Sequence, residues 1–318
     1  MILPPAVLAD AAVNLHNMEN YFAYSAGRFT AISGILTFGY GAFLAAFVYF
    51  VLTLKSLPPR YRLAGILSCC VAATAGSILY KEASQWLAVF SFDEATGDYV
   101  RNPGMLFSDT YRYVNWAITV PLLLMTLMIV IPMGSLAERR KTTVTLVVAG
   151  FSMVFASWIG SFYETDHVGG GNPLGFWFSY LVGWAFYVVL LVVVFKVLAE
   201  GKRRTTGAAS DLIGKLGVLF LVSWTVYAFV LVQPLLWWSE GSVVVRQGLF
   251  TVADVTSKAV YGVLMGRLAV AIAGSTPGLP NAYRSAAETG QPEGGGGSAG
   301  TDVGVEAREP GGTHPGNA

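Results

Sequence analysis

Two ionisable residues, Asp254 and Lys258, lie inside a long apolar run that extends from Val243 to Ala273. They are four residues apart, so a helix places both side chains on one face. A lysine this deep in an apolar span is costly as a free ammonium group. Two arrangements make it tolerable: an ion pair with a carboxylate, which Asp254 offers, or a Schiff base formed with an aldehyde. A buried pair that only holds helices together is the structural alternative, and it stays open at this point.

The composition indicates a protein with several membrane spans. Of the 318 residues, 54% are hydrophobic and only 12% are charged, whereas a soluble domain carries about 25% charged residues. The formal net charge of +1 gives no indication of a nucleic-acid partner. Cys69 and Cys70 are adjacent in an apolar span and are interpreted as small core residues. The three histidines lie outside the apolar spans, so we expect no haem or zinc site within the membrane.

Seven apolar segments are long enough to cross a bilayer, which takes about 20 residues. We predict membrane helices over 30–54, 62–88, 107–133, 143–163, 175–199, 212–238 and 245–273. The predicted fold class is therefore an all-α membrane protein, a bundle of seven transmembrane helices. The alternating pattern of residues 92–106, together with Gly97 and the Pro103-Gly104 pair, predicts a small β-hairpin between the second and third helices.

Basic residues alternate between the connections. The connections around 55–62, 138–141 and 202–204 are rich in Lys and Arg, whereas 89–106 hold only Arg101 and 164–174 hold none. The positive-inside rule then places the N-terminus outside and the C-terminus inside. Three parts are expected: an extracellular segment over 1–29 with a short surface helix within 14–27, the helical domain over 30–273, and a Gly-, Pro- and Ser-rich tail over 274–318 that is predicted to be disordered and cytoplasmic.

A polar stripe runs along the third predicted helix. By helical spacing, Arg112, Asn115, Thr119 and Thr126 lie near one face. Arg112 could be an anchor that reaches the membrane surface, but the stripe that runs inward from it favours the lining of a path. Thr119 has the alternative of bonding a carbonyl group of the preceding turn. Asn115 has no such local alternative, because a buried amide needs partners.

Three motifs on the expected helices resemble those of the microbial (type I) rhodopsins. The seventh helix carries Asp-x-x-x-Lys, the third carries Arg-Tyr-x-Asn-Trp-x-x-Thr-x-Pro from Arg112, and the sixth carries Trp-x-x-Tyr from Trp224. The resemblance covers about residues 15–273 and is closest to the bacterial branch that pumps sodium and chloride. Supporting phrases are Tyr24-Ser25-Ala26-Gly27, Ile159-Gly160-Ser161-Phe162-Tyr163-Glu164, and Arg246-Gln247 eight residues before Asp254.

The resemblance implies a cofactor and a set of site residues. Lys258 is expected to carry all-trans retinal as a protonated Schiff base, with Asp254 as its counterion. The other residues expected to bind retinal are Trp116, Met153, Ser157, Trp224, Tyr227, Ala228 and Ser257. Those expected along the ion path are Arg112, Asn115, Thr119, Thr126, Glu164, Arg246 and Gln247. The implied protein is not an enzyme but a light-driven transporter of a small ion, located in the bacterial plasma membrane and assembled as a homo-oligomer.

The residues of the third helix indicate which ion is expected. Chloride pumps of this branch have Asn, Thr and Gln where this chain has Asn115, Thr119 and Thr126, so two of the three positions match. Sodium pumps have an aspartate at the Thr119 position, and outward proton pumps have one at the Asn115 position. Counting the Schiff base, Arg112 and Asp254 alone gives a net charge of plus one, which a bound anion would balance.

We therefore expect inward chloride pumping, with hydrogen bonds to the anion from Asn115 and Thr119. The alternatives are an outward sodium or proton pump that uses Asp254 as its transient proton acceptor, and a photosensor or light-gated channel without net pumping. A transporter or receptor that binds no retinal is a further alternative.

Several positions depart from the family pattern or are expected to be peripheral. Ala228 stands where the family has a proline after the tyrosine of the sixth helix, and Thr126 replaces the glutamine of the branch. Tyr180 stands roughly where relatives that bind a carotenoid antenna have a glycine, so no antenna is expected. Lys81, Glu82, Glu164 and Arg246 lie near outer helix ends, and most of them are expected to be interfacial.

Overall fold

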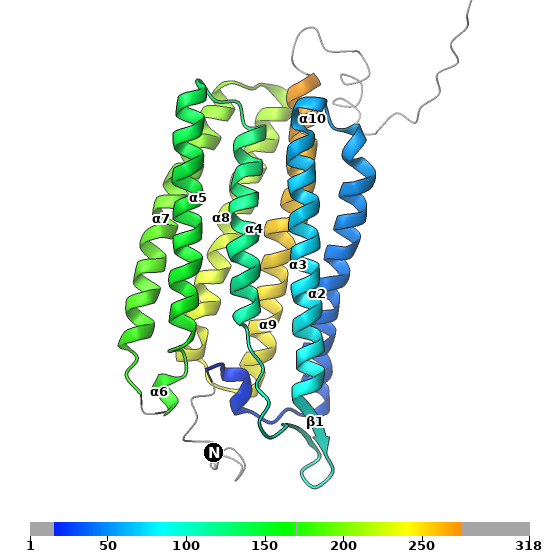
Figure 1. Ribbon diagram of the computed structural model, residues 1–318, viewed down its shortest axis with the longest axis vertical. Helices are drawn as coiled ribbons and strands as arrows, with labels where there is room; N and C mark the ends of the chain where they lie inside the picture. Colours follow the sequence, from blue (N-terminus) through cyan, green and yellow to red (C-terminus); the bar gives the residue numbers. More distant parts are fainter. Residues whose placement is uncertain (1–15, 170, 275–318) are drawn as a thin grey trace, which may run out of the picture.

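The computed structural model describes residues 16–169 and 171–274, and within these ranges seven long apolar helices form one bundle (Figure 1). Their bounds are α2 (Ala26–Thr53), α3 (Arg62–Val89), α4 (Thr110–Val130), α5 (Leu136–Ser161), α7 (Leu174–Arg203), α8 (Gly207–Leu236) and α9 (Glu240–Asp254). Helix α9 continues through a π-helix, η4 (Val255–Val260), into α10 (Tyr261–Gly274), and together they form the seventh span. The predicted fold class is confirmed. Residues 275–318, which include almost all of the predicted tail, lie outside the described residues.

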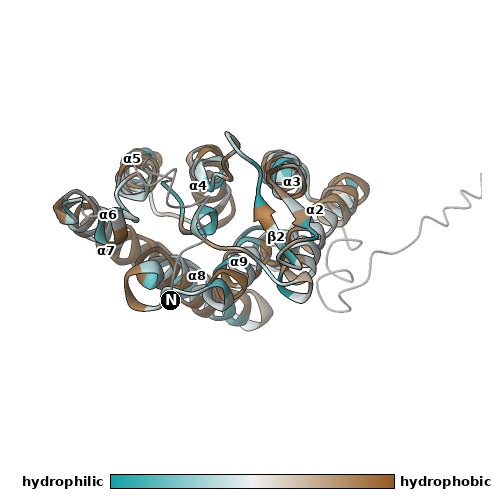
Figure 2. Ribbon diagram, turned by 90° about the horizontal axis from the view of Figure 1, so that it is seen from below, coloured by the Kyte–Doolittle hydropathy of each residue, from teal (hydrophilic) through white to brown (hydrophobic). Residues whose placement is uncertain are grey.

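Viewed along the bundle, the helices form a ring in which each packs against its neighbour in the chain (Figure 2). Helix α9 closes the ring against α2. Large apolar side chains cover the outer surface, such as Phe38 and Phe178, which are 61% and 71% exposed. Such a surface is expected where a helix faces lipid rather than water.

Two helices begin earlier than predicted because serine residues cap them. Helix α5 begins at Leu136 instead of residue 143, and the Ser135 hydroxyl accepts a hydrogen bond from the Glu138 amide. Helix α9 begins at Glu240 instead of residue 245, behind a capping box formed by Ser239 and Ser242. These caps satisfy free amide groups of the first turn, so the helices extend beyond their apolar residues.

One end of the bundle, here called the hairpin end, carries η1 (Met18–Tyr21), the strands β1 (Phe90–Asp93) and β2 (Asp98–Arg101), and the short helix α6 (Asp166–Gly169). The strands pair antiparallel, which confirms the predicted hairpin. The predicted surface helix near the N-terminus is wrong in its placement. Residues Met18, Glu19 and Asn20 of η1 are buried, so this segment fills the end of the bundle.

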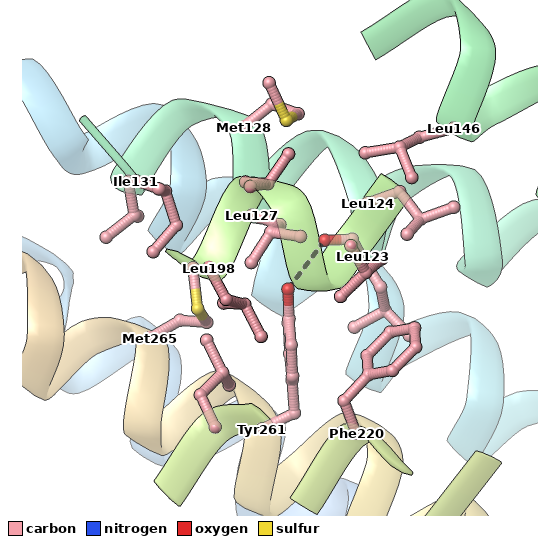
Figure 3. Close-up of a cluster of buried hydrophobic side chains, with 14 of the residues drawn as sticks. Leu123, Leu124, Leu127, Met128, Ile131, Leu146, Leu198, Phe220, Tyr261 and Met265 are labelled. Carbon is pink, nitrogen blue, oxygen red and sulfur yellow. Dashed lines mark hydrogen bonds between the residues drawn. The ribbon is translucent and has the colours of Figure 1, made fainter. Parts of the chain in front are cut away.

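The opposite end, here called the α10 end, has a tightly packed apolar interior. Figure 3 shows side chains from α4, α8 and α10 in contact there, among them Leu127, Phe220 and Met265. The Tyr261 hydroxyl, inside this cluster, donates a hydrogen bond of 2.9 Å to the carbonyl oxygen of Leu123. The short helices η2 (Leu54–Ser56) and η3 (Pro59–Tyr61) form the connection between α2 and α3 at this end.

Candidate functional site

Lys258 lies near the middle of the seventh span, within the π-helix η4. Single π-turns inside α-helices frequently occur at functional sites. The Lys258 ammonium group contacts the Asp254 carboxylate directly, and both side chains are almost completely buried. Asp254 Oδ1 also accepts hydrogen bonds from Trp116 Nε1 at 2.9 Å and from the Tyr227 hydroxyl at 2.7 Å. Neighbouring helices therefore hold this carboxylate against the lysine.

Lys258 also lines an apolar pocket. Aromatic and aliphatic side chains from α4, α5, α7 and α8 form its walls. They are Trp116, Val120, Leu123, Met153, Val154, Tyr180, Trp184, Tyr187, Trp224, Tyr227 and Leu231.

The sequence analysis predicted some, but not all, of the residues that line this pocket. Besides Lys258, the predicted residues that line it are Trp116, Met153, Ser157, Trp224, Tyr227, Ala228 and Ser257. The contribution of α7 was missed, namely Tyr180, Gly183, Trp184 and Tyr187. Their spacing of three, four and seven residues places them on one helix face, and this was the signal available in the sequence. Gly183 permits close packing there, because an added Cβ atom would lie 3.2 Å from the Ser157 hydroxyl.

Ala228, where the family pattern has proline, lies within the uninterrupted helix α8. Its carbonyl oxygen accepts a hydrogen bond of 3.1 Å from the Tyr180 hydroxyl. Ala228 and Tyr180, the position where antenna-binding relatives have a glycine, therefore contact each other and join α7 to α8 at the pocket wall.

Below Lys258, toward the hairpin end, Arg112 forms the centre of a buried ionic network. Its guanidinium group lies 3.3 Å from the Asp254 carboxylate, 3.0 Å from Glu82 and 3.6 Å from Asp109. It also donates a hydrogen bond of 2.7 Å to the side-chain oxygen of Gln247. Every one of these side chains is inaccessible to solvent or nearly so, so Arg112 is no surface anchor.

A second buried arginine, Arg246, continues the network to the end of the bundle. It binds the Glu164 carboxylate at 2.8 and 3.2 Å and lies 3.5 Å from both Glu19 and Asp109. Gln247 connects the two arginine clusters through hydrogen bonds to Glu19 at 3.0 Å and Asp109 at 3.2 Å. Burial, and then the negative charge of Asp109, raise the pKa of Glu19 to about 8 against the opposing effect of Arg246.

Glu82 is not interfacial, contrary to expectation. Its side chain is completely buried, whereas the neighbouring Lys81 is exposed and lies over the ring of Tyr111. The spacing from Leu79 and Trp86, which are also buried, places Glu82 on the inward face of α3.

The predicted net charge of plus one near Lys258 omitted Glu82, whose carboxyl group lies beside Arg112. With all groups ionised, Lys258, Arg112, Asp254 and Glu82 sum to zero. Among all buried charged side chains of the described residues, five are acidic and three are basic. The acidic ones are Glu19, Glu82, Asp109, Glu164 and Asp254.

The remaining predicted path residues on α4 do not join this network. The Thr119 hydroxyl donates to the carbonyl oxygen of Asn115 at 2.8 Å, which is the local alternative considered from the sequence. The Thr126 hydroxyl donates in the same way to Leu122 at 2.9 Å. Neither amide atom of Asn115 has a hydrogen-bond partner among the described residues, although the side chain is completely buried.

The family model of bacteriorhodopsin-like proteins matches residues 30–272. The chain belongs to the bacteriorhodopsin-like family. It is 26% identical over 226 residues to Opsin-1 of Neurospora crassa, covering 67% of this chain and 68% of the relative. It is 32% identical over 168 residues to Archaerhodopsin-3 of Halorubrum sodomense, covering 49% of this chain and only 56% of that relative.

Two solved structures are similar to this bacteriorhodopsin-like protein over most of their length. Xanthorhodopsin, described as a light-driven ion pump with dual chromophore, is 27% identical with a TM-score of 0.69. A thermophilic rhodopsin is 26% identical with a TM-score of 0.70. Each alignment covers 78% of this chain and 95% of the other.

Bacteriorhodopsin-like proteins bind retinal and are light-driven ion pumps or sensors rather than enzymes. Retinal is therefore the cofactor of this protein. The residues present fit such a group, because the pocket is apolar, has aromatic walls and is lined by a buried lysine. The side chains that contact Lys258 include a carboxylate, as a cationic nitrogen there requires.

Proposed function

We propose that this bacteriorhodopsin-like protein is a light-driven pump that moves protons outward, from Lys258 toward the hairpin end. All-trans retinal, bound to Lys258 as a protonated Schiff base, would supply the light-driven change that redirects the proton on the Lys258 nitrogen. The observation that carries the proposal is the acidic excess of the buried network between Lys258 and the hairpin end.

Asp254 is the first proton acceptor in this proposal. Its Oδ1 atom contacts the Lys258 nitrogen, so the N–H bond breaks and an O–H bond forms between atoms that already touch. Trp116 and Tyr227 hold the carboxylate in place from two other helices. Proton transfer requires this kind of hydrogen-bond reach between donor and acceptor.

Beyond Asp254, the buried groups suit a cation better than an anion. Arg112 and Gln247 link Asp254 to Glu82, Asp109 and the outer cluster. Rows of carboxylates favour cations, whereas anion paths are lined by arginine or lysine. The chain lacks both the aspartate that sodium pumps of this branch have at Thr119 and the one that outward proton pumps have at Asn115. The choice of the proton therefore rests on Asp254, whose carboxylate contacts the Lys258 nitrogen.

Inward chloride pumping, the expectation from the sequence, is the second candidate. Asn115 favours it, because its buried amide has no partner among the described residues and its N–H groups are free to bind an anion. The Asn115 and Thr119 pattern also supports membership of the chloride- and sodium-pumping branch.

The remaining features are also proposed. The basic connections lie at the α10 end, which we place in the cytoplasm, and the hairpin end then lies outside. We place the protein in a bacterial plasma membrane as a homo-oligomer. We propose that it carries no carotenoid antenna, because the Tyr180 ring lines the pocket wall.

Light-induced pH change in a suspension of retinal-supplied cells tests the function, with a K258A variant as the control. It is recorded in sodium chloride and in sodium sulfate, each with and without a protonophore. Outward proton pumping predicts acidification in both salts that the protonophore abolishes.

Other outcomes assign other functions. Alkalinisation that the protonophore enhances and that disappears in sulfate would establish inward chloride pumping. Alkalinisation that survives in sulfate but needs sodium would establish a sodium pump. A coloured protein without any signal would be a sensor.

A further inference from the structure

We propose that Glu82 determines the ion selectivity of this protein, because its carboxylate fills the charge position beside Arg112 that a bound anion would otherwise occupy. The inference rests on the proposed light-driven pump with retinal on Lys258. It assigns a role to a residue of α3, a helix that contributes no other charged side chain to the buried network.

The geometry makes Glu82 a direct partner of Arg112. Its Oε2 atom lies 3.0 Å from Nη2 of Arg112, and both side chains are completely buried. Nη1 of the same guanidinium group lies 3.3 Å from Asp254. Arg112 is therefore shared between two carboxylates, one from α3 and one from α9.

No other acid substitutes for Glu82 at this position. Asp109 lies farther from Arg112, at 3.6 Å, and is also engaged by Arg246 at 3.5 Å and Gln247 at 3.2 Å. Without the Glu82 charge, Arg112 and Lys258 would have Asp254 as their close shared carboxylate. An uncompensated buried charge is strongly unfavourable, so the site would then recruit a counterion from solution.

The structure also supplies a donor for such an anion. Asn115 follows Arg112 by one helical turn on α4, and its amide nitrogen has no hydrogen-bond partner among the described residues. In the wild-type protein, the Glu82 charge makes an anion there unnecessary. Loss of that charge should expose a latent chloride site.

The test compares purified wild-type protein with the variants E82Q, E82D and E94Q by visible absorption during chloride titration in a sulfate background. Glu94 is an exposed acid in the hairpin turn, so E94Q makes the same chemical change away from the site. The expected result is a chloride-dependent band shift in E82Q and no shift in the wild-type protein or in E94Q. E82D, which restores the charge, should again be insensitive to chloride.

If E82Q acted only by disturbing the packing around Glu82, its absorption band would not shift with chloride. E82D would then not be expected to restore the chloride-insensitive band. A wild-type band that shifts with chloride would overturn the proposal, as would a coloured E82Q variant that behaves like E94Q. If E82Q yields no coloured protein, wild type and E82A are compared in the same titration, and the same two outcomes decide. Failure of the proposed function would look different, because it would appear as a protein without a visible band or without light-driven pH change.

Discussion

Lys258 lies between two halves of the bundle whose interiors differ in polarity. Toward the hairpin end the interior holds two arginines and five acidic side chains in one connected network. Toward the α10 end the interior is filled by side chains such as Leu127, Phe220 and Met265 (Figure 3). Each charged group buried in the first half needs partners, whereas the second half excludes water by close packing.

This difference in polarity favours one direction for proton release. In the proposed function, a proton that leaves Lys258 meets a carboxylate on the hairpin side, where Asp254 contacts it. On the α10 side, the hydroxyl group of Thr126 is already bonded within its own helix. The asymmetry suits release of the proton toward the hairpin end and a closed apolar barrier toward the α10 end.

The largest expected effect comes from removing the residue at the boundary between the halves. Lys258→Ala should abolish the visible band completely, since no other buried lysine is present among the described residues to bind retinal. Absorption of the purified, retinal-supplied protein measures this. Lys81→Ala, which removes an exposed lysine, should retain the colour. A coloured Lys258→Ala variant would contradict the assignment of the Schiff base.

Substitution of Arg112, at the centre of the polar half, should give the next largest effect. Arg112→Gln leaves the carboxylates of Glu82 and Asp254 without their shared cation, and loss of one partner from a buried ion pair costs about 3–5 kcal/mol. The free energy of unfolding, measured in detergent with a chemical denaturant, should fall by this amount.

Arg28→Gln provides the matched control. Arg28 pairs with Glu240 near the surface, with 43% of its side chain exposed, and such pairs contribute about 0–1 kcal/mol. Equal losses in the two variants would show that the polar network does not stabilise the fold as described.

The outer end of the polar half should respond to pH through Glu19. Its pKa of about 8 in the folded protein exceeds the ordinary value of 4.5, so between these values the folded state binds a proton that the unfolded state has lost. Stability should therefore fall as pH rises from about 4.5 to about 8 and level off above. The midpoint of thermal bleaching measures this across the pH range.

Glu19→Gln should reduce this slope, because the glutamine does not titrate, whereas Glu94→Gln in the exposed hairpin turn should leave it unchanged. A stability that rises with pH over the same interval in the wild-type protein, or an equal slope in both variants, would show that Glu19 is ionised in the folded state.

The site around Lys258 could be predicted because it depends on short-range spacing. Asp254 and Lys258 share a helix face at a separation of four residues, and Trp224 and Tyr227 do so at three. The seven spans followed from length and hydropathy alone. The sequence motifs therefore located the pocket and most of its walls.

Arg112, Glu164, Arg246, Gln247 and Asp254 of the polar network were predicted from the motifs, but Glu19, Glu82 and Asp109 were not, because their positions depend on how each helix is rotated and how the connections fold. In a membrane bundle the lipid-facing and inward-facing sides of a helix are both apolar, so the pattern of α3 does not show which side Glu82 takes. Glu19 reaches the network only because η1 folds into the bundle end. The expected charge of plus one omitted Glu82 for this reason, and the expectation of chloride depended on it.

The smallest effect is expected in the apolar half. Tyr261→Phe removes the one hydroxyl that bonds the carbonyl oxygen of Leu123 in the cluster of Figure 3. The ring and its packing remain, so the loss should be about 1 kcal/mol, the contribution of a single hydrogen bond. The absorption band should stay where it is, because Tyr261 does not line the retinal pocket. A band shift comparable to that of a change at Tyr227 would mean that the apolar half is coupled to the chromophore and is not a passive barrier.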